Sequence, residues 1–399
     1  MTKKNIYKLI FESNLFIFLY CFVFKKYSID ILRFIKEKNN VKSKKVAFYF
    51  EHPLHYQNLP ELIKNLSYKK DTILIVFCGF KKSVCDVKLP DNVSVIYSTS
   101  HLFLKWLNAD LYISPRSSQK IGFPKGAERL HVFHSLIGIE VYPEDAFDEY
   151  DYVFCTGKHH IEELLDQYNK RNKKNKYLIP GGYPKLDNQI QRKKNDLLNK
   201  DISGTKTFIY APTLLNLETK KNSTLIEFGD KIINYVLELN HKLVFRPHPL
   251  NRDLEFVIKL KEKYKLHKRF TFDISHDYYN TYSSSDVMIT DFSGTAFTYS
   301  FSFEKPILFF MTKESLDLVK GSNKIQNSSR NKIGLTASSE NEFLENLNEI
   351  NKNYKIYQKN IVEFRDNIIF NVGKSEAYLA ECIDLILENK QSDSWVHIN

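Results

Sequence analysis

The chain has 399 residues, of which 43% are hydrophobic and 14% aromatic, with only 13 glycines and 12 prolines. This composition is sufficient for two hydrophobic cores and excludes a long disordered or low-complexity chain. The formal net charge of +11 favours anionic partners, such as a phospholipid surface, a polyanionic polymer or nucleic acid, although the lysine-rich runs 36–45 and 170–176 also fit a solvated face.

Residues 1–40 form a separate basic and apolar segment in the sequence. The apolar run 15–24 lies between lysines and is about half the length that a helix needs to span a bilayer. It ends in Phe24-Lys25-Lys26 without a small-residue cleavage site, which argues against a cleaved signal peptide. The pattern predicts a helix that either lies in the plane of a membrane or packs on the catalytic body.

From about residue 45 the sequence alternates short apolar strands with helical stretches, which predicts parallel sheets covered on both faces. We expect an α/β fold with a Rossmann-like domain at 41–190, a polar linker at 191–206 and a second Rossmann-like domain with C-terminal helices at 207–399, the two facing a cleft. The predicted strands are 46–50, 73–77, 93–97, 111–114, 130–133, 152–155 and 177–179, and then 208–211, 243–245, 270–272, 287–290 and 307–310.

The most informative stretch is the strand 287–290 followed by a small polar turn and a helical run. Backbone N–H groups and the positive end of a helix dipole make such a turn a phosphate site, and Gly294 allows close approach of a ligand. The alternative is an ordinary turn in which Asp291 or Ser293 caps the helix.

Several other predicted strands also end in polar residues, and ligands of open parallel sheets bind beyond the carboxyl ends of the strands. A single histidine there is more often structural, but the repetition favours the rim of an anion-binding cleft. The residues concerned are Glu51, His52, His55, His134, Thr213, Arg246, His248, Asp291, Ser293, Gly294 and Thr295.

Several common sites are excluded by the sequence. It has no GxGxxG after an early strand, no P-loop and no GxSxG nucleophile elbow. Its five cysteines lack metal-ligand spacing, which favours a reducing cytoplasm. No paired aspartates stand out as a metal site for a nucleotide-sugar.

Five motifs occur in the order found in CDP-glycerol glycerophosphotransferases, the GT-B-fold polymerases and primases of teichoic acids and capsules, and the chain resembles this family over about 130–385. A sixth segment, Gly182-Tyr183-Pro184-Lys185-Leu186-Asp187, resembles the family's segment between domains. The five motifs are Tyr210-Ala211-Pro212-Thr213, Arg246-Pro247-His248-Pro249, Ser285 to Ser293, Lys305-Pro306-Ile307 and Gly373-Lys374-Ser375-Glu376.

The sequence departs from the family at three places that bear on the substrate. The family's Trp-His-Gly is Phe133-His134-Ser135 here, its Tyr-Ser-Ser after the aspartate is Phe292-Ser293-Gly294-Thr295, and the arginine expected after Thr213 is absent. The donor alcohol therefore stays open between glycerol phosphate, ribitol phosphate and a sugar.

The resemblance implies transfer of an alditol phosphate from a CDP-activated donor to a hydroxyl of a lipid-linked or glycan acceptor, with release of CMP. His134 is then the expected base, and Arg246 and His248 would donate hydrogen bonds to the phosphoryl oxygens. Thr213 and Asp291 would join Ser293, Gly294 and Thr295 in binding the donor. Glu51, His52 and His55 would bind the acceptor or have a structural role.

The same resemblance implies no required cofactor and no protein metal site, although a divalent cation could assist. It places the protein in the cytoplasm, at an anionic membrane surface, with no nucleic-acid partner. Two alternatives stay open. One is a GT-B glycosyltransferase that uses a nucleotide-sugar, with an epimerase as a variant, and the other is a non-catalytic basic module.

Overall fold

The computed structural model describes residues 46–50, 53–56, 59–69, 73–78, 93–98, 104, 109–117, 123–136, 138–196, 205–215, 223–275, 277–319 and 328–399. The predicted helix within 1–40, and the candidate residues Glu51 and His52, lie outside this part of the chain. Two compact units follow from the contacts. The first takes the described residues up to His134, with Ile139–Lys185 and Phe370–Asn399, and the second takes Ser135–Gly138 and Leu186–Ile369.

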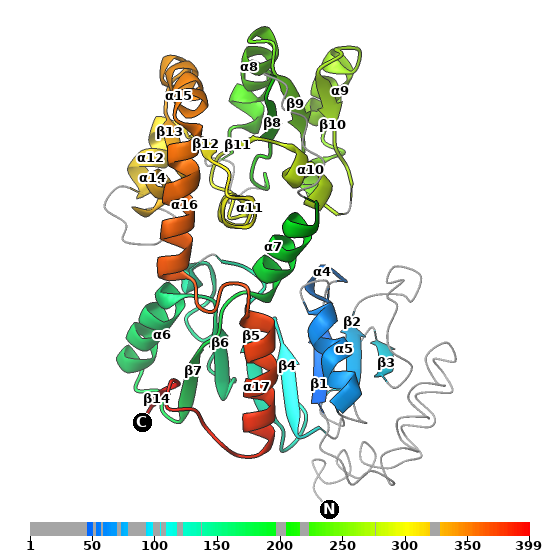
Figure 1. Cartoon of the computed structure of the whole chain (residues 1–399), viewed down its shortest axis with the longest axis vertical. Coiled ribbons are helices and arrows are strands. Elements are labelled where there is room, and N and C mark those ends of the chain that lie inside the picture. Colours follow the sequence, from blue (N-terminus) through cyan, green and yellow to red (C-terminus); the bar gives the residue numbers. More distant parts are fainter. Residues whose placement is uncertain are drawn as a thin grey trace, which may run out of the picture. The chain divides into compact units, whose positions relative to one another are not determined.

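The first unit is an α/β unit built on an eight-stranded sheet in the order β14-β7-β6-β5-β4-β1-β2-β3 (Figure 1). Its strands are parallel except β14, which pairs antiparallel with β7. The strands are β1 (Val46–Phe50), β2 (Ile73–Cys78), β3 (Val93–Ser98), β4 (Leu111–Ser114), β5 (Glu128–Val132), β6 (Tyr152–Cys155), β7 (Lys176–Pro180) and β14 (Val396–Ile398). The helices are α4 (Pro53–Tyr56), α5 (Pro60–Lys69), α6 (Lys158–Lys170) and α17 (Ser375–Leu387), with the short η3 (Ile139–Val141).

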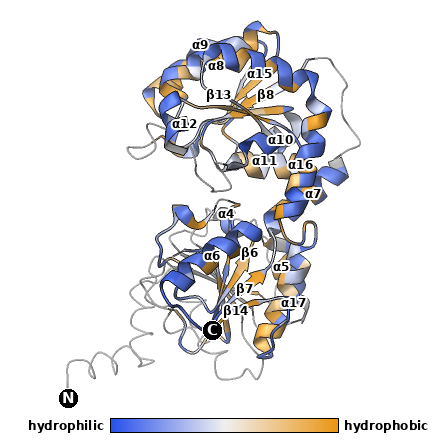
Figure 2. Ribbon diagram, turned by 90° about the vertical axis from the view of Figure 1, so that its left-hand side faces the viewer, coloured by the Kyte–Doolittle hydropathy of each residue, from blue (hydrophilic) through white to orange (hydrophobic). Residues whose placement is uncertain are grey.

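Strand β1 is buried on both faces, which explains why it is apolar throughout rather than alternating. Phe48 faces a core that includes residues of α5 and α17, whereas Tyr49 faces a second core that includes residues of α6. Figure 2 shows the same division in each unit, with apolar strands inside and polar helix surfaces outside. Burial of this apolar area is the main term that stabilises the sheet.

The second unit contains a six-stranded parallel sheet in the order β10-β9-β8-β11-β12-β13. The strands are β8 (Thr207–Tyr210), β9 (Lys242–Phe245), β10 (Phe270–Phe272), β11 (Val287–Thr290), β12 (Ile307–Phe310) and β13 (Gly334–Ala337). The helices are α8 (Leu225–Glu238), α9 (Glu255–Tyr264), α10 (Tyr279–Ser284), α11 (Thr295–Phe303), α12 (Lys313–Val319), α14 (Arg330–Ile333), α15 (Glu340–Lys352) and α16 (Tyr354–Ile368), with η5 (Pro249–Asn251). Helix α7 (Pro184–Asp196) runs across the boundary between the units.

Strand β13 was not predicted, and its sequence explains why. It begins with Gly334, a weak strand former, but a Cβ at that position would lie 1.8 Å from the carbonyl oxygen of Ile307 on β12. Only glycine permits this close approach of the two backbones. The residue that weakens the strand pattern is therefore the residue that the sheet requires.

The C-terminal segment differs from the predicted second domain at 207–399, because Phe370–Asn399 belongs to the first unit. Strand β14 pairs with β7, and Trp395 packs edge-on against Tyr152 at 5.8 Å between ring centres. The predicted linker 191–206 also differs in part, because α7 continues to Asp196. A long C-terminal helix does not reveal in the sequence which sheet it covers, since either core would bury its apolar face.

The motif Gly373-Lys374-Ser375-Glu376 anchors this C-terminal segment. The hydroxyl of Ser375 accepts the N–H of Tyr183 at 2.9 Å, and the carboxylate of Glu376 accepts the N–H of Leu62 near the start of α5. Gly182 has φ +104°, and a Cβ there would lie 2.4 Å from the Ser375 hydroxyl oxygen. Two of the motifs that carried the resemblance are thus packed against each other as structural contacts.

Candidate functional site

Each sheet has one switch point, where the next strand along the chain is added on the opposite side of the sheet from the strands before it. In the first unit, β2 and β3 extend the sheet on one side of β1, and the chain then returns to add β4 on the other side. In the second unit, β9 and β10 extend it on one side of β8 before β11 is added on the other. Ligands of open α/β sheets bind outside the carboxyl ends of the strands at such switch points. The predicted residues that the structure describes all follow strands at or next to these two points.

In the first unit the structure brings His55 and His134 together. His55 lies in α4 after β1, His134 follows β5, and their ring centres are 4.6 Å apart. Nδ1 of His134 lies 3.1 Å from the carbonyl oxygen of Pro115, which follows β4. Because a carbonyl oxygen only accepts, Nδ1 must carry the proton and the lone pair must reside on Nε2. The ring is therefore held in the tautomer of a base.

The surroundings of His134 favour its neutral form. Burial lowers the pKa of His134, the Pro115 carbonyl opposes this shift, and the charge of Lys185 adds to it. The hydroxyl of Tyr183 donates to the backbone carbonyl of His134 at 2.7 Å. The segment after β7 thus holds the histidine in place, and its lowered pKa keeps the ring neutral at neutral pH.

His131 lies two residues earlier and has a different role. Its ring is 1% exposed and packs on Phe133, Phe147 and Tyr150 at 4.5, 4.9 and 5.0 Å between ring centres. Burial lowers the pKa of His131 to about 3. This histidine is a neutral core residue, and it shows why strand position alone does not identify a catalytic group.

In the second unit the polar turn after β11 leads into α11, as predicted. Ser293, Gly294 and Thr295 are partly exposed, and no side chain caps the N-terminus of α11. Gly294 has φ −64° and ψ −15°, a right-handed conformation open to any residue. The Thr295 hydroxyl is 2.8 Å from the Tyr282 hydroxyl. Backbone N–H groups, a helix dipole and hydroxyls therefore meet at one strand end, as an anion site requires.

Asp291 is fully buried and holds the loop that follows β8. Its carboxylate accepts the backbone N–H of Thr213 at 2.7 Å, the N–H of Thr224 at 2.9 Å and the Thr224 hydroxyl at 3.1 Å. Burial raises the pKa of Asp291 to about 6 against the effect of these donors. The structure therefore relates Asp291 to the candidate site through the position of Thr213.

Arg246 and His248 follow β9. Arg246 Nη1 donates to Asp273 at 2.5 Å, and Nη2 donates to the carbonyl oxygen of Ser275 at 3.0 Å. His248 accepts the N–H of Leu250 on Nδ1 at 3.2 Å, so its neutral ring carries the proton on Nε2. Burial and the charge of Arg252 lower the pKa of His248. This histidine presents an N–H donor, the opposite of His134.

Sequence reasoning missed Arg330, the first residue of α14. Its guanidinium carbon lies 4.5 Å from the ring centre of Phe292, which directly precedes Ser293, and 5.5 Å from that of Phe309. No motif marks this arginine. The only sequence signal is a cation in the connection between two strands of the second sheet, and many surface residues share this feature.

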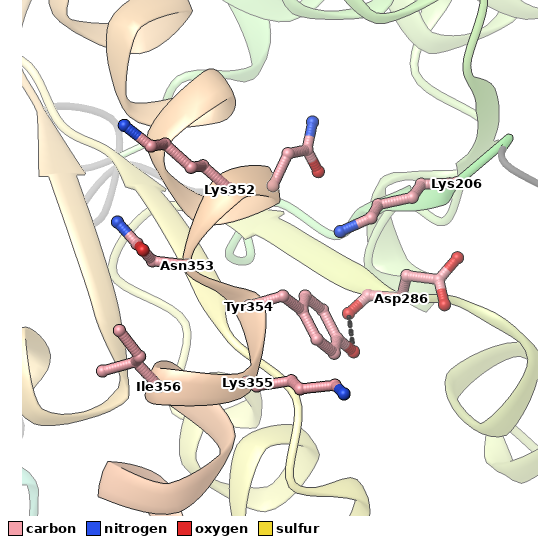
Figure 3. Close-up of a pocket in the computed structure, with 8 residues that line it drawn as sticks. Lys206, Asp286, Lys352, Asn353, Tyr354, Lys355 and Ile356 are labelled. Atoms are coloured by element: carbon pink, nitrogen blue, oxygen red, sulfur yellow. Dashed lines mark hydrogen bonds between the residues drawn. The ribbon is translucent and has the colours of Figure 1, made fainter.

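A surface pocket of about 400 Å³ lies at the opposite edge of the second sheet, where the strands begin (Figure 3). Lys206 precedes β8, and its ammonium lies 4.3 Å from the ring centre of Tyr354 at the start of α16. The Tyr354 hydroxyl donates to the carbonyl oxygen of Asp286 at 3.0 Å. These contacts attach α16 to the sheet, and the pocket is separate from the switch point, which is at the other edge.

Two features of the described residues bear on the predicted cofactors and membrane contact. Within the described residues, no three histidine, cysteine or acidic side chains are grouped in a way that could hold a metal ion. Among the helices that the structure describes, none has the length and apolar character needed to cross a bilayer.

Comparison with solved structures identifies the fold. The wall teichoic acid polymerase TagF has a TM-score of 0.62 and 16% identity, covering 98% of this chain and 99% of that chain. The S. aureus MnaA–UDP co-structure has a TM-score of 0.58 and 14% identity, covering 88% and 99%. The Neisseria meningitidis UDP-GlcNAc 2-epimerase bound to UDP-GlcNAc has a TM-score of 0.57 and 14% identity, covering 85% and 99%. At these identities the similarity shows the fold alone, which is GT-B-like.

Comparison of sequences identifies the family. The minor teichoic acid biosynthesis protein GgaB of Bacillus subtilis (strain 168) is 24% identical over 285 residues, covering 62% of this chain and 29% of that protein. The chain therefore spans less than a third of the length of this relative. The model of the CDP-Glycerol:Poly(glycerophosphate) glycerophosphotransferase family matches residues 31–384. With this match over most of its length, the chain belongs to that family.

Proposed function

We propose that this protein transfers an alditol phosphate from a CDP-activated donor to a hydroxyl group of a cell-envelope polymer or its lipid-linked precursor. The observation that carries the proposal is the pair of histidine tautomers next to the two switch points. His134 offers a lone pair on Nε2, and His248 offers a proton on Nε2. Family membership and the relationship to GgaB and TagF, both named for teichoic acid synthesis, support this substrate class.

The proposed reaction is a displacement at the β-phosphorus of the donor. The acceptor oxygen attacks this phosphorus, a new P–O bond forms, the bond to the bridging oxygen breaks, and CMP leaves. His134 takes the acceptor proton, a role that its depressed pKa suits at neutral pH. His248 and the N–H groups of the turn Ser293–Thr295 stabilise charge on the phosphoryl oxygens. His55 lies beside His134, and we assign it to the acceptor hydroxyl.

Arg246 has a less direct role in this proposal than the sequence suggested. Its guanidinium is tied to Asp273 and Ser275, which fixes its position and compensates its charge. The remaining N–H groups of the fork are the ones that a phosphoryl oxygen would accept from. Asp291 contributes by holding Thr213.

A donor panel tests the proposal. The full chain is incubated with CDP-glycerol, CDP-ribitol and UDP- and GDP-sugars, with a lipid-linked glycan as acceptor, and the released nucleotide is identified. We expect CMP from a CDP-alditol. Release of UDP or GDP instead would establish a nucleotide-sugar glycosyltransferase, the second candidate, which is favoured by the fold similarity to structures that contain UDP or UDP-GlcNAc.

We also propose that no cofactor is required and that a divalent cation at most stimulates the reaction. The donors around the switch point of the second unit are hydroxyls, backbone N–H groups and an arginine, which neutralise phosphate without a metal. Assays with a chelator and with added Mg²⁺ test this. Complete loss of CMP release in the chelator, restored by Mg²⁺, would contradict it.

We further propose that the protein binds to the inner face of the cell membrane and takes part there in the synthesis of a capsule-like polymer or a teichoic acid. The apolar run 15–24 and its flanking lysines fit a helix in the plane of an anionic leaflet. Each juxtamembrane lysine would add about 1 kcal/mol. The full chain should sediment with anionic vesicles, less so at high salt, and a chain lacking 1–36 should stay in solution. If the truncated chain fails to fold, residues 1–36 pack on the catalytic body instead, and the membrane proposal is contradicted.

A further inference from the structure

The pocket of about 400 Å³ at the strand-start edge of the second sheet is lined by three lysines (Figure 3). Lys206 precedes β8, Lys352 ends α15, and Lys355 lies in the first turn of α16. Two parts of the chain that are distant in sequence therefore bring positive charges to one recess. Asp286 is the only carboxylate among the described residues that line it. The lining thus carries three positive charges against one negative charge.

The other two ionisable side chains of the lining already have partners within the fold. The Asp286 carboxylate accepts the backbone N–H of Thr207 at 2.8 Å, and the Tyr354 hydroxyl donates to the carbonyl oxygen of Asp286 at 3.0 Å. By contrast, none of the three lysine ammonium groups forms an ion pair or a hydrogen bond with another described residue. The contacts that attach α16 to the sheet therefore leave the positive charges of the pocket largely uncompensated.

The electrostatics of the neighbouring strand starts agree with this excess of positive charge. Burial lowers the pKa of Lys206. Burial also lowers the pKa of His241, which directly precedes β9, and the charges of Lys206 and Arg269 lower it further. Asp286 opposes both shifts. The field at this edge of the sheet is therefore positive, which favours an anionic ligand.

We propose that this pocket is a second binding site, which takes a phosphodiester group of an alditol phosphate polymer. The inference rests on the proposed function, because repeated alditol phosphate transfer makes a polymer with one negative charge per unit. Figure 3 shows Lys206 and Lys355 extending toward the tip of Tyr354 from two sides, whereas Lys352 extends away from it. Two ammonium groups placed in this way suit the two non-bridging oxygens of one phosphodiester.

The pocket suits a flexible polymer better than a nucleotide or a membrane. A nucleobase would stack on an aromatic face, but the Lys206 ammonium lies 4.3 Å from the centre of the Tyr354 ring. A bilayer presents its headgroups on an extended surface, whereas these lysines line a recess. A polymer can enter a recess and repeats its phosphate along the chain. Weak contacts at this pocket and at the reaction site would therefore combine into a higher affinity.

Binding of a fluorescent poly(glycerol phosphate) oligomer to the full chain, measured by polarisation, tests the site without turnover. We expect Lys206→Met/Lys355→Met to weaken oligomer binding about 5- to 30-fold and to leave CDP binding within about twofold. Lys206→Arg/Lys355→Arg keeps both charges and should retain most of the affinity. Added salt should weaken oligomer binding more in the wild type than in the Met variant.

Lys259→Met/Lys359→Met is the matched control, because it removes the same charge elsewhere on the second unit. Lys259 on α9 and Lys359 on α16 are exposed and form ion pairs with Glu255 at 2.6 Å and Glu363 at 3.7 Å. The control variant should bind the oligomer like the wild type. If it weakens binding as much as the pocket variant does, net charge rather than the pocket attracts the oligomer, and the proposal is overturned. Unchanged binding in the pocket variant would overturn it as well.

The same variants distinguish the polymer from other sources of phosphate. The pocket variant should sediment with phosphatidylglycerol vesicles like the wild type. Lost sedimentation with oligomer binding retained would assign the pocket to a membrane, and a loss of CDP affinity as large as that of oligomer affinity would assign it to a nucleotide. Either result overturns the proposal. Because no donor is needed, a chain that binds the oligomer through this pocket but releases no CMP would refute only the proposed function.

Discussion

His134 in the first unit and His248 in the second both follow a parallel strand, yet their rings are held in opposite tautomers. The Pro115 carbonyl oxygen accepts a hydrogen bond from the Nδ1–H of His134, whereas the Leu250 N–H donates a hydrogen bond to Nδ1 of His248. One ring therefore offers a lone pair on Nε2 and the other a proton. The lesson is that the backbone group beside a neutral histidine decides whether its Nε2 can accept or donate a hydrogen bond.

The residues around the two histidines differ in a way that agrees with the difference between their tautomers. His134 has His55 beside it and a buried aromatic layer around His131 beneath it, with no acidic partner to hold a positive charge among the contacts described above. His248 shares its strand ends with an arginine, hydroxyls and a helix N-terminus. The first arrangement suits proton transfer and the second suits phosphate, although both are built on the same type of sheet.

Replacing His134 should produce the largest effect. His134→Ala should lower kcat about 10²- to 10⁴-fold, the usual contribution of a general base, and leave donor affinity unchanged. Turnover and CDP binding are measured in parallel, with His397→Ala as a control histidine on β14. A variant that loses donor binding while its melting temperature is unchanged would mean that the two histidines have been assigned in the wrong order.

The second largest effect should be on the pH dependence of the free energy of unfolding, and it comes from Asp291 in the second unit. Its pKa of about 6 is raised above the unfolded value, so the folded state binds the extra proton between about pH 4 and pH 6. Ionisation of Asp291 should therefore cost about 3 kcal/mol of stability as the pH rises through this window. Denaturant unfolding of the wild type and of Asp291→Asn at pH 4 and pH 7 measures it. Parallel pH profiles for the two proteins would contradict the prediction.

Gly294→Val should weaken donor binding with little effect on the fold. The backbone of Gly294 is right-handed and tolerates a side chain. We expect the branched side chain to hinder an anion that approaches the N–H groups of the turn. We expect the CDP dissociation constant to rise about 5- to 100-fold. This factor corresponds to the free energy that overpacking usually costs. Unchanged nucleotide affinity in a titration would remove this turn from the proposed site.

Replacement of His248 should have the smallest effect on donor affinity and turnover when the new residue keeps an N–H donor. His248→Ala should weaken both donor affinity and turnover, by about tenfold for one hydrogen bond to a charged group. His248→Gln keeps an N–H donor near the position of Nε2 and should recover most of this loss. If His248→Gln behaves like His248→Ala, the Nε2 proton is not the group that matters.

The pH dependence of turnover sharpens the comparison further. Because the pKa of His134 is lowered and the base must be neutral, activity should persist below pH 6.5 and fall only at more acidic pH. A profile of kcat against pH at saturating donor measures this limb. An acid limb above the ordinary histidine range would mean that a different group is the base.

Most of the strands could be predicted from the sequence, because buried parallel strands are short apolar runs that end in polar residues. The predicted strand 46–50 and β1 coincide, as do 287–290 and β11. Strand β13 was missed because its required glycine weakens the pattern, and β14 because its central residue is the exposed His397, which interrupts the apolar run. The unit to which α17 belongs was predicted wrongly, since amphipathicity identifies a buried face but not its partner.

The positions of the candidate residues after strands could be predicted, but their contacts could not. The sequence places His134 and His248 after strands, and the tautomer of each follows only from its backbone partner. Asp291 was expected at the donor, and the structure shows its carboxylate occupied by Thr213 and Thr224. Arg330 gave no signal because its proximity to Phe292 depends on the three-dimensional path of the chain between β12 and β13.

The pairing of β14 with β7 has a consequence for how the protein is made. The first unit needs Phe370–Asn399, which is synthesised after the second unit, whereas nearly all of the second unit is contiguous in Leu186–Ile369. The later-encoded sheet can thus reach its native contacts before the earlier one is complete. Until Phe370–Asn399 has been synthesised, the first unit lacks the strand that pairs with β7 and the helix α17 on its core, and this leaves an open sheet edge for a chaperone to shield.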